Sequence, residues 1–151
     1  MFRGIHLVLL DAKSRMAIPA KYRTQLENLS QNRLVVTIDT DEPCLLLYPL
    51  NEWELIEQQI IGLPSFHKAS RRIQRLLIGH ATDLELDNNA RILIPALLRE
   101  YAGIDKNVML IGQGKKFEIW SEANWQANRQ DWLTDTSLKE ELSPPLQTLS
   151  L

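Results

Sequence analysis

Two short motifs in this sequence place an arginine four residues after an aspartate. The first is Asp11 with Arg15, and the second is Asp87 with Arg91. A guanidinium group presents a fork of donors that suits carboxylates, phosphates and the O6 and N7 acceptors of guanine. Two compatible interpretations follow. In one, each pair is a salt bridge that holds the shape of a turn; in the other, the turn presents its arginine to DNA.

The basic residues are concentrated in two parts of the chain, although the formal net charge of the 151 residues is only -2. Residues 1–30 carry five basic and two acidic side chains, and residues 61–80 carry four basic and no acidic ones. Such cationic surfaces bind nucleic acid in a salt-dependent way. We therefore add Arg3 and Lys13 to the candidate DNA contacts. The second block supplies a secondary basic patch: Arg71, Arg72 and Arg75. A solvated helix face is the alternative for this patch.

No group of residues in the sequence points to catalysis. The three histidines have no metal-ligand spacing with one another or with the single cysteine, Cys44. Cys44 begins an apolar stretch, which is typical of a small core residue. The acidic stretch at residues 39–42 is interpreted as a solvated loop, and Gly112 and Gly114 are too close together for a phosphate-binding loop. We predict no enzyme activity, no cofactor or metal, and no small-molecule substrate.

Composition places the chain among ordinary globular proteins. It is 44% hydrophobic and 24% charged. Its apolar runs are too short for a membrane span of about 20 residues, so no membrane partner is expected. One cysteine cannot form an intramolecular disulfide, which suits a reducing compartment. These features favour a cytoplasmic protein.

Both motifs lie inside an internal duplication. Residues 6–19 align with residues 82–95 at an offset of 76, and residues 48–53 align with residues 120–125 at an offset of 72. The pattern of each copy predicts strand, turn, strand, helix, strand, turn, strand and a trailing helix. Because so small a unit buries too little surface to fold well alone, we predict that the two copies pair their hairpins. The chain would then resemble a homodimer made from one polypeptide.

Apolar spacing identifies residues that are expected in the core and at helix ends. Trp53 and Trp125 occupy equivalent helix positions and are expected to anchor the two halves. Gly103 is expected to end a helix, and Ser70 to cap the helix of the linker between the copies. The first helix is expected to bury one face, formed by Tyr22, Leu26 and Leu29.

Taken together, these residues resemble the MraZ family of bacterial transcriptional regulators, which are built from two SpoVT-AbrB-like modules. The resemblance covers nearly all of residues 1–130. It rests on the doubled Asp-x-x-x-Arg motif and on three further segments: Ile18-Pro-Ala-Lys-Tyr-Arg23, Arg71-Arg72-x-x-Arg75 and Phe117-Glu-Ile-Trp120. It implies an α+β fold in which two tandem swapped-hairpin modules form one pseudo-dimeric β-barrel with flanking helices.

The same resemblance implies boundaries for four parts of the chain. The two modules are expected at residues 1–53 and 82–125, with a helical linker at residues 54–81 between them. A C-terminal helix and tail would follow at residues 126–151.

The family resemblance also implies a function. Its members bind short direct repeats in double-stranded DNA, in the promoter of the division and cell-wall gene cluster. They do so in the cytoplasm, associated with the nucleoid, as ring-shaped homo-oligomers. The resemblance places DNA contact on the motif residues Asp11, Arg15, Asp87 and Arg91. The alternative function is an oligomeric scaffold whose basic face docks an acidic partner.

The two motifs differ in the residues that precede the arginine. Many family members have Lys-Gly there, where this chain has Lys13-Ser14 in the first copy and Asn89-Ala90 in the second. The second copy is therefore less cationic. From this difference we predict unequal halves, with the first copy binding DNA more tightly.

Overall fold

The computed structural model describes residues 1–135 and 148–150. The first copy comprises β1 (Phe2–Leu9), β2 (Arg15–Ala17), α1 (Ala20–Ser30), β3 (Arg33–Ile38), β4 (Leu45–Pro49) and α2 (Leu50–Ile61). The linker contains α3 (Lys68–Ile73), which continues into the π-helical turn η1 (Gln74–Ile78). The second copy comprises β5 (Thr82–Glu85), β6 (Arg91–Leu93), α4 (Ala96–Ala102), β7 (Asn107–Gly114), β8 (Lys116–Ser121) and α5 (Glu122–Thr134). Most of the predicted tail lies outside the described residues. No helix in the described ranges is both long and apolar enough to cross a membrane.

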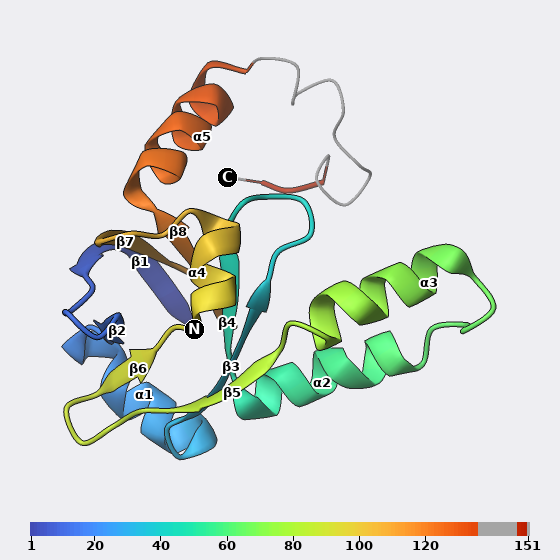
Figure 1. Cartoon of the computed structure of the whole chain (residues 1–151), viewed down its shortest axis with the longest axis horizontal. Coiled ribbons are helices and arrows are strands. Elements are labelled where there is room, and N and C mark those ends of the chain that lie inside the picture. Colours follow the sequence, from blue (N-terminus) through green and yellow to red (C-terminus); the bar gives the residue numbers. More distant parts are fainter. Residues whose placement is uncertain (136–147, 151) are drawn as a thin grey trace.

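Strands of the two copies are exchanged across one antiparallel sheet. Its order is β1-β7-β8-β4-β3-β5, and β2 pairs with β6 in a separate two-stranded ribbon (Figure 1). Thus β1 of the first copy pairs with β7 of the second, and β5 of the second pairs with β3 of the first. The predicted pairing between copies is confirmed, but β1 and β2 do not form a hairpin with each other. Each of them pairs with the other copy instead.

The α+β class is confirmed, whereas the predicted closed barrel is wrong. β1 and β5 are the two edges of an open six-stranded sheet, and the ribbon does not join it. Closing a barrel requires every strand to pair on both sides. The ribbon strands have three residues each and pair only with one another. The free edge of β1 is instead partly covered by α1, since Tyr22 and Lys21 donate hydrogen bonds to the carbonyl of Arg3.

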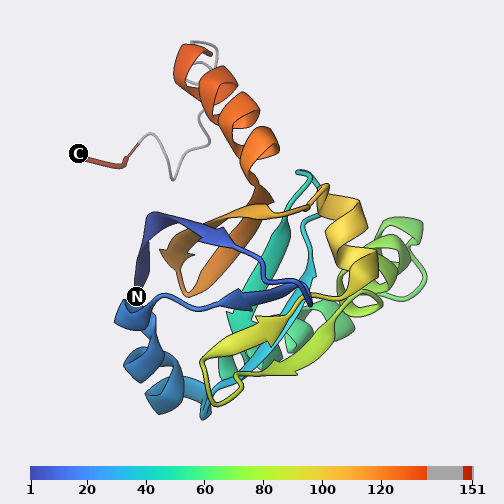
Figure 2. The same ribbon diagram turned by 60° about the vertical axis from the view of Figure 1, so that its left-hand side comes forward.

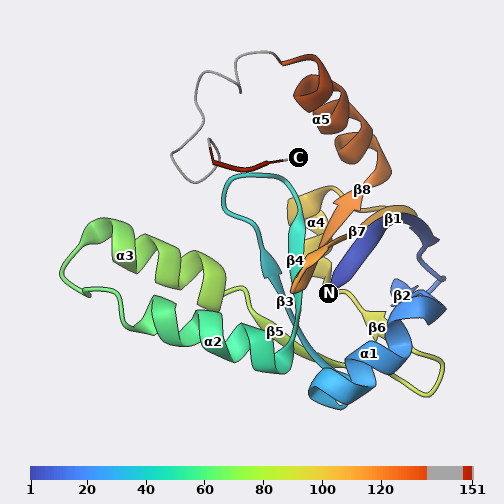
Figure 3. The same ribbon diagram turned by 180° about the vertical axis from the view of Figure 1, so that it is seen from behind.

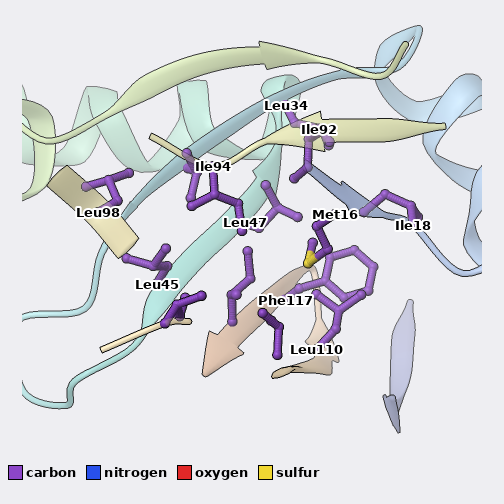
Figure 4. Packing of buried hydrophobic residues seen from close by; sticks show 14 of the residues in the cluster. Met16, Ile18, Leu34, Leu45, Leu47, Ile92, Ile94, Leu98, Leu110 and Phe117 are labelled. Atoms are coloured by element: carbon purple, nitrogen blue, oxygen red, sulfur yellow. The ribbon is translucent and has the colours of Figure 1, made fainter. Parts of the chain in front are cut away.

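The main core lies between the sheet, the ribbon, α1 and α4. Met16 and Ile92, the central residues of the two ribbon strands, are buried in it with Phe117 and Leu110 (Figure 4). Successive side chains of a strand point to opposite sides. Burial of Met16 and Ile92 therefore turns their neighbours on the ribbon, including both motif arginines, towards solvent.

The far face of the sheet is covered differently in the two copies. Trp53 of α2 is buried there, as predicted, and contacts Tyr48. Trp125 of α5 is only partly buried, although it packs against a buried cluster as predicted. The fully buried anchor is Trp120 on β8, against which Trp125 and Trp132 pack edge to face.

Two helix predictions also need correction. Leu29, in the last turn of α1, is exposed rather than buried. Ser70 does not cap the linker helix: α3 begins at Lys68, and Ser70 is buried inside it. α2 and α3 lie side by side as an arm that projects from the sheet (Figures 1 and 3).

Candidate functional site

Each Asp-x-x-x-Arg motif is a turn that its aspartate closes. Asp11 Oδ1 accepts hydrogen bonds from the backbone N–H groups of Lys13 and Arg15, both at 2.9 Å, and its Oδ2 accepts one from Nε of Arg15 at 2.7 Å. Asp87 holds Arg91 in the same way, at 2.9 Å to the backbone nitrogen and 3.0 Å to Nε. The salt-bridge interpretation is therefore confirmed for both motifs.

These hydrogen bonds keep both carboxylates ionised. The backbone N–H of Arg15 is the main cause that lowers the pKa of Asp11, and the backbone N–H of Arg91 does the same for Asp87. Each aspartate thus stays charged at neutral pH and fixes the direction of its arginine.

The ribbon brings the two turns onto one surface. Arg15 lies opposite Leu93 and Ala17 lies opposite Arg91, so the two arginines occupy diagonal corners of the outer face. Nη1 of Arg91 is also 3.7 Å from Oδ2 of Asp11. Figure 2 shows the two ribbon strands side by side in front of the larger sheet.

The arginines keep part of their donor surface available. Their side chains are 30% exposed at Arg15 and 27% exposed at Arg91. Within residues 1–135 and 148–150, the side chain of Arg15 donates a hydrogen bond only through Nε, and neither of its Nη nitrogens donates one. Arg91 is held by two carboxylates, whereas Arg15 is held by one.

The other predicted DNA contacts are distributed over the molecule. Lys13 is exposed beside the first turn and therefore joins the motif residues. Arg3 is exposed on β1, and seven residues separate it from Asp11, so it lies outside the turn. The secondary basic patch, formed by Arg71, Arg72 and Arg75, is exposed on the projecting arm, away from the ribbon (Figure 1).

Arg99 supports the first turn, a role that the sequence analysis did not predict. Nη1 of Arg99 donates to Oγ of Ser14 at 2.8 Å, while its Nε donates to the carbonyl of Ile94. The equivalent arginine, Arg23, donates Nε to the carbonyl of Ile18. Arg23 and Arg99 are 76 positions apart, the offset of the duplication, which was a signal in the sequence for this bracing role. The link from helix to turn exists only for Ser14, because an alanine occupies the equivalent position.

Cys44 lies beside two acidic side chains, a grouping that the spacing of these residues in the sequence did not predict. Its sulfur and carboxylate oxygens of Asp39 and Glu118 lie within 4.8 Å of one another. Burial, aided by the charge of Glu118, raises the pKa of the Cys44 thiol, which opposes formation of a thiolate nucleophile. Glu118 accepts a hydrogen bond from Nε1 of Trp120 at 3.0 Å. The expectation that Cys44 is a buried core residue is confirmed.

Fold and site together define an internally duplicated α+β protein with strands exchanged between its repeats. Its distinguishing surface is a short ribbon that carries two arginines, each fixed by an aspartate.

Comparison with known proteins identifies the family. The chain belongs to the MraZ family, whose model, described as MraZ protein and antitoxin-like, matches residues 1–76 and again residues 77–142. Proteins from Coxiella burnetii, Marinomonas sp. and Legionella pneumophila are 57%, 52% and 51% identical to it. Each match covers 100% of both chains, and each of these relatives is named transcriptional regulator MraZ.

Proposed function

We propose that the protein is a transcriptional regulator that binds double-stranded DNA through the outer face of the β2–β6 ribbon. The names of its relatives support regulation of transcription. The observation that carries the DNA site is the meeting of two Asp–Arg turns on one exposed ribbon. A two-stranded ribbon is narrow enough to enter the major groove. The Nη groups of Arg15 then have the geometry to bind guanine O6 and N7 or a phosphate.

Each candidate residue has a defined task in this proposal. Arg15 and Arg91 contact the DNA, and Asp11 and Asp87 orient them. Lys13 binds a phosphate beside the first turn. Residues outside the ribbon supply further phosphate contacts: Arg3, Arg71, Arg72 and Arg75.

The two halves contribute unequally. The first turn carries Lys13 where the second has the uncharged Asn89. Arg91 is in addition shared between two carboxylates, which neutralises its charge more than that of Arg15. We therefore expect Arg15 to contribute more to DNA affinity than Arg91.

The wider setting follows from the family resemblance. We propose that the target is a set of short direct repeats in the promoter of the division and cell-wall gene cluster, bound in the cytoplasm at the nucleoid. A ring-shaped homo-oligomer would place several ribbons on neighbouring repeats and raise their effective concentration. The support for assembly is an apolar strip on β1, formed by Ile5, Leu7 and Leu9, whose side chains are 54–59% exposed.

We also propose that the repeats are SpoVT-AbrB-like swapped-hairpin modules at residues 1–53 and 82–125. A helical linker at residues 54–81 joins them, and residues 126–151 follow as a C-terminal helix and tail. The exchange of β1 and β5 between the copies supports this division.

A salt-titrated mobility shift tests the function. The probe is the DNA upstream of the protein's own gene, and the control is the same DNA shuffled. We expect preference for the first, steep weakening with salt, and about tenfold weaker binding for Arg15→Ala because a bidentate contact is lost. Arg129→Ala, which removes an exposed arginine of α5, is the matched control and should bind as the wild type does.

The outcomes separate the candidate functions. Equal binding to specific and shuffled DNA would favour the scaffold that docks an acidic partner. A larger loss for Arg91→Ala than for Arg15→Ala would contradict the unequal halves. Thermal unfolding of each variant checks that the change lies in binding and not in folding.

A further inference from the structure

An exposed leucine lies among the charged residues of the ribbon face. Leu93 on β6 is 54% exposed and stands directly opposite Arg15. The hydrogen bond from Ile94 N to the carbonyl of Ser14 lies next to this pair, and the bond from Ile18 N to the carbonyl of Ala90 lies at the other end of the ribbon. Hydrogen-bonded and non-hydrogen-bonded pairs alternate along an antiparallel ribbon. Arg15 and Leu93 are therefore a non-hydrogen-bonded pair, in which Cα atoms are about 4.5 Å apart and side chains are closest.

The fold does not require a leucine at this position. The equivalent residue of the first copy is Ala17, which lies opposite Arg91. Among the described residues, Leu93 belongs to none of the three apolar clusters that form the interior. Its side chain thus contributes little to packing within the chain and is presented to whatever binds the ribbon.

Resting on the proposed function, we propose that Leu93 contacts the C5-methyl group of a thymine beside the guanine that Arg15 binds. The thymine methyl is the apolar group that base pairs present in the major groove, and apolar side chains recognise it. Bases on one strand are about 3.4 Å apart. Side chains of a directly opposed strand pair, with Cβ atoms about 5 Å apart, therefore reach the same or adjacent base pairs.

The pair then combines two kinds of recognition. Arg15 supplies donors for guanine acceptors, and Leu93 supplies an apolar surface for the neighbouring methyl group. On the other diagonal, Arg91 faces Ala17, whose single methyl group offers a smaller apolar surface than the leucine side chain. Thymine is therefore read by the half of the ribbon that carries Arg15 and Leu93, and the asymmetry gives the protein a direction on its site.

Replacing thymine by deoxyuracil tests this contact, since it removes only the C5-methyl group and leaves the hydrogen-bonding edges unchanged. The probe is the DNA upstream of the protein's own gene, with the thymines of its direct repeats replaced one position at a time. For the wild type we expect one position to weaken binding about fourfold, the effect of losing one buried methyl-sized group. Leu93→Ala should bind the unmodified DNA more weakly and show no further loss at that position.

Leu97→Ala is the matched control, because Leu97 is 63% exposed on α4 but lies outside the ribbon. It should keep the full response to deoxyuracil. If Leu93→Ala responds to deoxyuracil as the wild type does, the assignment of Leu93 is wrong. It is also wrong if Leu93→Ala changes the oligomeric state in light scattering and leaves the response intact. Failure of the wild type to prefer its own upstream DNA over shuffled DNA would instead overturn the proposed function.

Discussion

The residue before each motif arginine carries a backbone conformation that side chains disfavour. Ser14 has φ 64° and Ala90 has φ 56°, both in the left-handed region. For a residue with a Cβ this conformation costs about 1 kcal/mol or more, whereas glycine adopts it freely. Ser14 is compensated by the hydrogen bond from Arg99, at 2.8 Å, and Ala90 has no hydroxyl to accept one.

Replacing Ala90 by glycine should therefore stabilise the protein. For Ala90→Gly we expect the free energy of unfolding to rise by about 1 kcal/mol, measured by urea denaturation. Ser14→Gly is the companion variant and should give no gain, because it relieves the same strain but loses the hydrogen bond to Arg99. An equal gain in both variants would show that this hydrogen bond contributes nothing.

At the scale of the elements, β1 and β5 are equivalent edge strands with different surfaces. The exposed positions of β1 carry Leu7 and Leu9, whereas the equivalent positions of β5 carry Asp83 and Glu85. Charged residues on an edge strand prevent pairing with another chain, and exposed apolar ones invite it. The β5 edge is thus suited to solvent, whereas the β1 edge is suited to contact with another chain.

Replacing the two exposed leucines of β1 by the acidic residues found on β5 tests whether β1 mediates assembly. The double variant Leu7→Asp, Leu9→Glu gives β1 the surface that β5 already tolerates, so its thermal stability as a single chain should be retained. We expect light scattering to show the proposed homo-oligomer for the wild type and a smaller species for the double variant. Leu55→Asp, at an exposed position of α2, is the control and should assemble normally. An unchanged oligomer in the double variant would exclude β1 as the interface.

At the scale of the whole molecule, strand exchange makes the two repeats dependent on each other. β1 finds its neighbour on β7, β5 finds its neighbour on β3, and the ribbon needs one strand from each repeat. The shared core contains Met16 and Leu26 of the first copy together with Ile92 and Leu98 of the second. Dividing the chain would therefore divide both the sheet and the core.

Separate fragments should show this dependence. We expect fragments of residues 1–76 and 77–151 to lack a cooperative unfolding transition as monomers, since each loses its edge pairing and half of its core. Mixing them should restore native circular dichroism and a cooperative transition. A stably folded monomer of residues 1–76 would contradict the prediction.

Local features were predictable from the sequence to different degrees. Gly103 ends α4 in the left-handed conformation, as expected, because the requirement for positive φ is local. The alternation of Leu84 with Asp83 and Glu85 is typical of a half-buried strand, and β5 has that burial pattern. The π-helical turn after α3 was not predicted, since its Leu77 carbonyl is bound by Thr37, forty residues away. The burial of Trp120 in place of Trp125 depends in the same way on packing between distant elements.

The sequence by itself determined the duplication, and it predicted the α+β class and a salt bridge within each Asp–Arg motif. The duplication is written in the residues themselves, and the Asp–Arg turns rest on contacts between residues two to four apart, such as Asp11 with Lys13 and Arg15. Only the tertiary structure decided that the sheet stays open, that Arg91 approaches Asp11, and that Arg3 lies apart from both. The physical reason is that strand pairing joins residues some 76 positions apart, and the choice of partner depends on burial across the whole chain.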